Sequence, residues 1–171
     1  MKKTIAIAAI AALAGTAMAQ DTLNLDISGS QSWEFQGDPL NETLNVLVGS
    51  GANITNISWD VNLTTVAPSW ADESTIGLFG NSVVLTPGAG VATTVTNENF
   101  TGSQAVNITL GADGMLDIEF YEVGFNDVAG GVDSFYEPGS TVTLSGSGFV
   151  PTPGSLAVLG LGGLVAGRRR R

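Results

Sequence analysis

The distribution of charge along the chain places the strongest limit on how it can fold. All sixteen Asp and Glu residues lie within residues 21–137, whereas the six Lys and Arg residues are Lys2, Lys3 and the arginines at 168–171. The chain contains no His and no Cys. Residues 4–167 therefore have neither cationic side chains for salt bridges nor cysteines for disulfides. A fold in this segment must be stabilised by an apolar core, by hydrogen bonds or by a bound cation.

Apolar and polar residues alternate over many short segments between residues 20 and 149. Ile57, Trp59 and Val61, for example, alternate with Ser58 and Asp60. A period of two with one apolar face is typical of a half-buried β-strand. About eight or nine such strands, with no helix between them, predict an all-β fold, a β-sandwich or jelly roll. The expected strands are 23–27, 43–48, 57–64, 75–79, 82–86, 92–96, 106–110, 116–121 and 141–145.

Residues 1–19 have the pattern of a secretory signal peptide. Two lysines precede a short apolar stretch, and Ala17 and Ala19 have the small-x-small spacing that signal peptidase cleaves. The apolar stretch is shorter than the roughly 20 residues that a membrane-spanning helix needs. We expect a signal-peptide helix, export through the Sec machinery and cleavage that leaves Gln20 as the first residue. The alternative is an N-terminal anchor that is not cleaved.

The C-terminal segment has three parts in a fixed order. A proline-rich entry is followed by an apolar stretch over residues 155–167 and by an arginine cluster. As a helix the apolar stretch would rise about 20 Å, which is less than the roughly 30 Å of a hydrocarbon core. An arginine cluster resists translocation and stays on the cytoplasmic side. The entry and the cluster consist of Val150, Pro151, Thr152, Pro153, Gly154, Arg168, Arg169, Arg170 and Arg171.

These three parts together resemble the PEP-CTERM sorting signal of exported bacterial proteins, with Pro151-Thr152-Pro153 where the family has Pro-Glu-Pro. The resemblance covers residues 150–171. It implies an inner-membrane intermediate, processing by an exosortase-like membrane protease, and a final location at the cell surface or outside the cell. We expect a β-sandwich domain over residues 20–146 and a linker with the sorting motif over 147–154. A short C-terminal anchor that is retained is the alternative.

The composition of the segment between the two ends excludes several function classes. Phosphate binding depends on Lys and Arg, so nucleic acid is not expected as a partner. Without His, Cys or Lys the segment cannot form a Ser-His-Asp triad, a thiolate nucleophile, an imidazole zinc site or a Schiff base. Glycoside hydrolysis by two carboxylates is the one enzyme class left open. Asp72 and Glu73 beside Trp70 are an acid–aromatic cluster suited to it, although we expect a protein that is not an enzyme.

Acidic residues are densest over residues 113–137. Asp117 and Glu119 share one side of an expected strand, and the following loop offers the oxygen ligands of Asp127 and Asp133. Oxygen ligands without nitrogen or sulfur favour Ca²⁺. A solvated acidic face without metal is the alternative. Residues 113–147 also resemble the closing strands of the P domain of proprotein convertases, which implies a jelly-roll accessory domain with calcium at these same two loop residues.

The three tryptophans bear on the second of two function hypotheses, whereas the first follows from the terminal signals, the missing catalytic residue types and the acidity. Trp59 shares parity with its apolar neighbours and is expected in the core, whereas Trp33 and Trp70 are candidates for stacking on a sugar ring or for packing at the rim of the core. The first hypothesis is an exported, surface-sorted, non-catalytic β-sandwich protein of the extracellular matrix or biofilm. The second is a carbohydrate-binding module with an extracellular polysaccharide as partner and Ca²⁺ as a stabilising cofactor.

Overall fold

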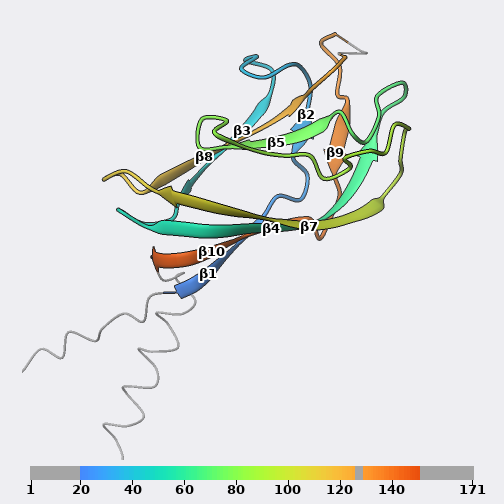
Figure 1. The fold of residues 1–171 in the computed structure, drawn as a ribbon. Helices are drawn as coiled ribbons and strands as arrows, with labels where there is room; N and C mark the ends of the chain where they lie inside the picture. Colours follow the sequence, from blue (N-terminus) through green and yellow to red (C-terminus); the bar gives the residue numbers. More distant parts are fainter. Residues whose placement is uncertain (1–19, 126–128, 151–171) are drawn as a thin grey trace, which may run out of the picture.

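The computed structural model describes residues 20–125 and 129–150, which form two antiparallel sheets around one core (Figure 1). This confirms the all-β prediction and the sandwich-like arrangement of the sheets. The expected signal-peptide helix and the apolar sorting helix lie outside the described residues. The ten strands are β1 (Gln20–Asp26), β2 (Gln31–Ser32), β3 (Glu42–Leu47), β4 (Asn53–Thr65), β5 (Ser74–Leu78), β6 (Val83–Leu85), β7 (Glu98–Thr109), β8 (Met115–Glu122), β9 (Ser134–Tyr136) and β10 (Thr141–Phe149).

The part of the chain that the structure describes contains no helix with the length and apolar character needed to span a membrane.

The strands pair in a nested order along the chain. β1 pairs with β10, β2 with β9, β3 with β8, β4 with β7 and β5 with β6, all antiparallel. The chain therefore resembles one long hairpin with its tip at β5 and β6, folded over on itself. Further pairings of β4 with β10 and of β5 with β8 join the nested pairs into sheets. The larger sheet has the order β1-β10-β4-β9-β2, with β7 also paired to β4, and the smaller has the order β3-β8-β5-β6.

The core consists of the inward-facing apolar residues of both sheets. These are the apolar positions of the alternating segments, so the period-two prediction is confirmed for the long strands. A register irregularity between Ile54 and Asn56 shifts the parity of β4, and both Ile54 and Ile57 therefore face inward. Fully buried members of the core include Ile54, Ile57, Val61, Leu63, Val142 and Leu144 of the larger sheet and Ile76, Leu78, Leu116, Ile118 and Phe120 of the smaller sheet.

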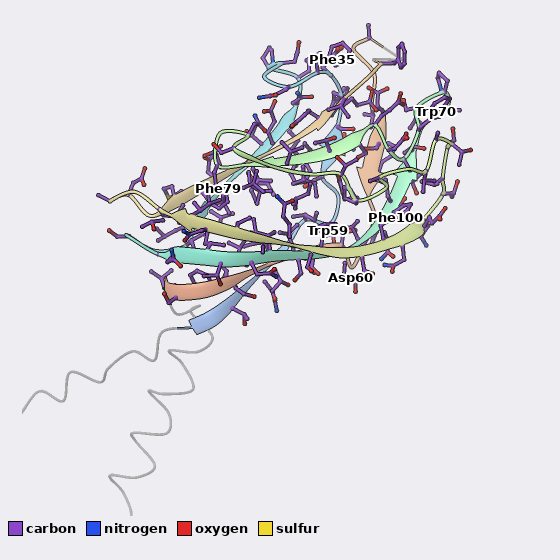
Figure 2. The ribbon with its side chains drawn as sticks, in the orientation of Figure 1. Phe35, Trp59, Asp60, Trp70, Phe79 and Phe100 are labelled. Carbon is purple, nitrogen blue, oxygen red and sulfur yellow. The ribbon has the colours of Figure 1, made fainter. Side chains whose placement is uncertain are left out.

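Trp59 packs against this core, as its parity predicts (Figure 2). Its partner across the ladder on β7 is Gly102, and a Cβ atom at this glycine would overlap the indole ring. The absence of a side chain at residue 102 therefore leaves the space that the indole ring occupies.

One predicted strand is wrong. Residues 92–96 form no strand, because this loop uses its backbone to hold the last residue of β4 and the segment that follows it. The Thr65 N–H donates to the Val95 carbonyl at 3.0 Å, and the Ala71 N–H donates to the Thr93 carbonyl at 3.0 Å. Alternation in a threonine-rich loop therefore does not distinguish a strand from an irregular segment that is hydrogen-bonded along one side.

The number and limits of the strands also differ from the prediction. The sequence does not predict β2 and β9, which have two and three residues and are too short to show a period of two. β10 continues to Phe149, beyond the expected domain limit at residue 146, and its Gly146 and Ser147 pair with β4. The first three residues of the expected 147–154 linker therefore belong to the sheet.

Candidate functional site

One end of the sandwich has a buried interior of polar side chains, and we name it the polar end. β4 runs toward it from the opposite end, where Gln20 pairs with Phe149, and at Leu63 to Thr65 it pairs with β9. The buried polar side chains of the polar end are Ser32, Thr65, Ser69, Glu73, Ser74, Glu122, Asp133 and Ser134, together with Tyr136.

Four hydroxyl groups form a continuous network inside the polar end. The Ser134 Oγ lies 2.7 Å from the Ser32 Oγ and 2.8 Å from the Ser74 Oγ, and the Ser74 Oγ lies 3.1 Å from the Tyr136 Oη. The Tyr136 ring packs against Phe120 with a centroid distance of 5.2 Å. Because Ser74 belongs to the smaller sheet and the other three hydroxyls to the larger, the network joins the two sheets by hydrogen bonds.

Burial changes the protonation equilibrium of the tyrosine in this network. Loss of contact with water raises the pKa of Tyr136 well above its ordinary value, and the hydrogen bond with Ser74 offsets part of that increase. The hydroxyl therefore stays neutral in the folded protein at any physiological pH, and it can act as both donor and acceptor.

Two carboxylates of the polar end accept hydrogen bonds, one from a hydroxyl and one from a backbone N–H. Asp133 Oδ1 accepts from the Ser69 Oγ at 3.0 Å, and Glu73 Oε2 accepts from the Trp70 N–H at 2.7 Å. Glu122 ends β8, where its own N–H donates to a carbonyl of the β2–β3 loop. A buried carboxylate needs compensating interactions, and a segment without Lys, Arg or His has neutral donors with which to supply them.

Three loops cover the polar end and are bonded to one another through the backbone. The Glu122 N–H donates to the Glu34 carbonyl at 2.9 Å, and the Val123 N–H donates to the Glu73 carbonyl at 3.0 Å. Each loop carries an exposed aromatic side chain, and we name the three together the aromatic tip. Figure 2 shows two of these side chains, Phe35 and Trp70, at this end of the molecule. The three side chains are Phe35, Trp70 and Phe125, which are 48%, 44% and 70% exposed.

The structure separates the three tryptophans. Trp70 is exposed, Trp33 is half-buried beside Ser32, and Trp59 lies against the core. Of the two sequence candidates for sugar stacking, Trp70 is therefore the more exposed. Phe35 and Phe125 were not predicted, because a single aromatic residue in a loop carries no periodic signal.

The predicted calcium ligands are not brought together within the described residues. Asp133 is buried next to Ser69, and Asp127 lies outside the described ranges. Over residues 20–125 and 129–150 no group of three or more acidic side chains is arranged to hold a metal ion. Calcium therefore stays a prediction from the sequence.

Asp117 and Glu119 do share one side of β8, as predicted, and both accept hydrogen bonds from loops. Asp117 Oδ2 accepts from the Gly80 N–H at 2.6 Å, and Glu119 accepts from the side-chain amides of Asn41 and Asn81 at 3.0 and 2.9 Å. These two acids fasten the β2–β3 and β5–β6 loops to the outer face of the smaller sheet.

The structure describes only some of the residues of the expected signal-peptide cleavage site and sorting motif. Ala17, Ala19 and the motif residues from Pro151 onward lie outside the described residues. Gln20 is the first residue of β1, and the Val150 N–H donates to the Val48 carbonyl at 2.7 Å.

The alternation of apolar and polar residues does not predict that these polar side chains are buried, although a signal for some of them exists. Ser74 shares parity with Ile76 and Leu78, and Glu122 shares parity with Ile118 and Phe120. Extending the inward-facing parity by two residues past the last apolar position predicts both of them.

Comparisons with known proteins do not assign the chain to a family. No protein-family model matches the chain, and no match was found among curated proteins.

Proposed function

We propose that this chain is an exported, surface-sorted, non-catalytic protein of the extracellular matrix or biofilm type. The observation that carries the proposal is the pairing of β1 with β10, the two strands nearest to the expected terminal signals, with Leu23 opposite Leu144 and Leu25 opposite Val142. Both expected signals therefore join the domain at the same edge of the larger sheet. Their removal would leave this pairing and the core behind it in place.

The absence of catalysis is part of the same proposal, and the hydrogen bonds of the polar end support it. Glu73 is buried and accepts a bond from the Trp70 backbone, so it is not available beside Asp72 as one of the two carboxylates that a glycosidase places in a cleft. Asp133 is likewise buried, beside Ser69.

We further propose that the sandwich is a jelly roll. The β1-β10-β4-β7 path in one sheet and the β3-β8-β5-β6 order in the other support this description. Nested antiparallel pairs wrapped into two sheets are what two Greek keys produce. In this proposal β2 and β9 are a fifth nested pair that extends the larger sheet at the polar end.

Intact mass and fractionation of the protein from its native cell test the export proposal. We expect a mature chain that begins at Gln20, that lacks the arginine cluster, and that is absent from the cytosol. Replacement of Ala19 by Leu should block the N-terminal cleavage alone, and replacement of Arg168–Arg171 by Ser should impair the C-terminal processing alone. A chain of unaltered mass in the cytosol would refute the proposal.

Carbohydrate binding at the aromatic tip is the second candidate function. Three exposed aromatic side chains on adjoining loops offer surfaces on which a sugar ring could stack. An anionic glycan is not expected, because residues 4–167 contain no cationic side chain.

Retention on insoluble and arrayed neutral polysaccharides tests this second candidate. We expect Trp70→Ala to abolish retention, whereas Leu47→Ala, at an exposed apolar residue of β3 outside the polar end, should leave it unchanged. Equal retention of both variants, or no retention of the unaltered protein by any glycan, would remove the carbohydrate candidate and leave the export proposal intact.

A further inference from the structure

The outer edge of β7 is the longest unpaired strand edge among the described strands. β7 has twelve residues, and β4 is its single partner in the described sheet (Figure 1). No backbone hydrogen bond joins residues 98–109 to any other described segment. An edge of this kind presents a row of free N–H and C=O groups on which another strand can pair.

The inward-facing side chains of β7 are also incompletely covered. Phe100, Val106 and Ile108 are only partly buried against the core, whereas Leu23 and Leu25 of β1, at the opposite edge of the sheet, are each less than a tenth exposed. A strand added beyond β7 would cover the remaining apolar surface of these three side chains and remove it from water.

β7 lacks the features that protect most edge strands from pairing with another molecule. Protected edges carry lysine, proline or inward-pointing charges. β7 has one charged residue, Glu98 at its first position, and it has no Lys and no Pro. Its register irregularity affects only the segment between Ala105 and Ile108, so residues 98–105 form an uninterrupted ladder with β4.

We propose that β7 pairs antiparallel with β7 of a second copy of this chain, so that their two larger sheets become one continuous sheet. Charge favours this place on the surface of each copy. Each copy carries sixteen acidic side chains and no cationic one within residues 4–167, so two copies repel each other except where charge is sparse, as along β7. A two-fold axis through the pair lets the same strand serve both copies.

The outward-facing side chains of β7 suit such self-pairing. They are small or capable of hydrogen bonding, and in a two-fold pair similar side chains face one another without like charges in register. In a two-fold pair the outward row would lie beside the same row of the second copy. The half-buried apolar row on the inner face would likewise lie beside its counterpart. The exposed residues of the outward row are Thr101, Ser103, Ala105, Asn107 and Thr109.

Disulfide formation between single-cysteine variants of the full chain tests the proposal. The chain has no cysteine of its own, and directly paired residues of an antiparallel ladder have Cα atoms about 4.5–5.5 Å apart, within disulfide range. Under mild oxidation in detergent, we expect covalent dimer to peak at one position of the series and to fall on either side. The series is Asn99→Cys, Thr101→Cys, Ser103→Cys, Gln104→Cys and Ala105→Cys.

Ser147→Cys is the matched control, because Ser147 is exposed on β10 of the same sheet but away from the β7 edge. Every variant keeps the same terminal segments, so association through those segments would cross-link the control as readily as the series. A flat profile, or a yield no higher than that of the control, would overturn the proposal. Pairing of β7 with a strand of a different protein gives the same flat profile and overturns it too.

A second pair of variants separates edge pairing from general charge effects. In sedimentation of the full chain in detergent, Ser103→Glu should weaken the dimer about 2–5-fold by placing like charges close to the two-fold axis, whereas Ser147→Glu should not. Equal dimer dissociation constants for the two variants would contradict pairing through β7.

Discussion

The two ends of the sandwich bury side chains of different chemistry. Near the paired Gln20 and Phe149 the interior is apolar and mainly aliphatic, and we name it the aliphatic end, whereas the polar end buries hydroxyls and carboxylates. Stability at the aliphatic end depends on the apolar area removed from water, which varies smoothly with side-chain size. Stability at the polar end depends on every buried group keeping its partner, so a single deletion affects several groups. The same pair of sheets therefore tolerates different substitutions at its two ends.

The largest effect is expected from a truncation in the aliphatic interior. Ile57 is fully buried on the central strand β4, and Ile57→Ala should lower the free energy of unfolding by about 2–5 kcal/mol through lost burial and the cavity left behind. Urea denaturation measures this change. Thr101→Ala, at an exposed position on β7, is the control and should change it by less than about 0.5 kcal/mol. Equal losses for the two variants would mean that the aliphatic interior is not tightly packed.

A smaller loss is expected from deleting one hydroxyl of the network. Ser134→Ala leaves the hydroxyls of Ser32 and Ser74 without a shared partner and should cost about 1–3 kcal/mol in free energy of unfolding. The same chemical change at the exposed Ser103 should cost less than about 0.5 kcal/mol. If the two serine variants unfold at the same urea concentration, the buried hydroxyl network does not stabilise the polar end as proposed.

Alkaline pH distinguishes the polar end without a change in packing. Burial raises the pKa of Tyr136, so the unfolded chain loses this proton above about pH 10 while the folded chain keeps it. The unfolded state then binds fewer protons than the folded state, and stability falls as the pH rises above about 10.

Tyr136→Phe should cost about 1 kcal/mol at neutral pH through the lost hydrogen bond and should reduce the alkaline slope of stability. Some slope should remain, because burial and the charge of Glu119 raise the pKa of Tyr121 as well. Identical slopes for variant and parent between about pH 9 and 11 would show that the Tyr136 hydroxyl is not sequestered.

The smallest effect on stability is expected at the aromatic tip. Trp70 is exposed, so Trp70→Ala should change the free energy of unfolding by less than about 1 kcal/mol. Thermal unfolding measures this change. A larger loss would indicate that the Trp70 side chain packs in the interior of the polar end and is not exposed for stacking.

The aliphatic end could be predicted from the sequence, and the reason is periodicity. Leu23 and Leu25 of β1 and Ile57 and Val61 of β4 follow a period of two, so parity alone assigns them to the core. The shift at Ile54 could not be predicted, because a β-bulge leaves the residue types unchanged and alters only which face each residue occupies.

The polar end could not be predicted as a unit. Ser134 and Ser32 occupy strands of three and two residues, and the period-two rule assigns polar residues to the solvent side. Their burial is decided by partners far away in the sequence, since Ser134 contacts residues 102 and 60 positions away. Trp70 could be named as a candidate site residue from its residue type, but its exposure follows from the loop that carries it.

The nested strand order has a consequence for how the chain reaches its final form. β10 lies between β1 and β4, so the larger sheet stays open until residues 141–149 have arrived. Only the hairpin of β5 and β6 closes locally, and each outer pair must bring together more distant parts of the chain, which slows folding. Under the proposed export, this order would keep the chain unfolded while it crosses the membrane, because the pairing that completes the larger sheet involves its last strand.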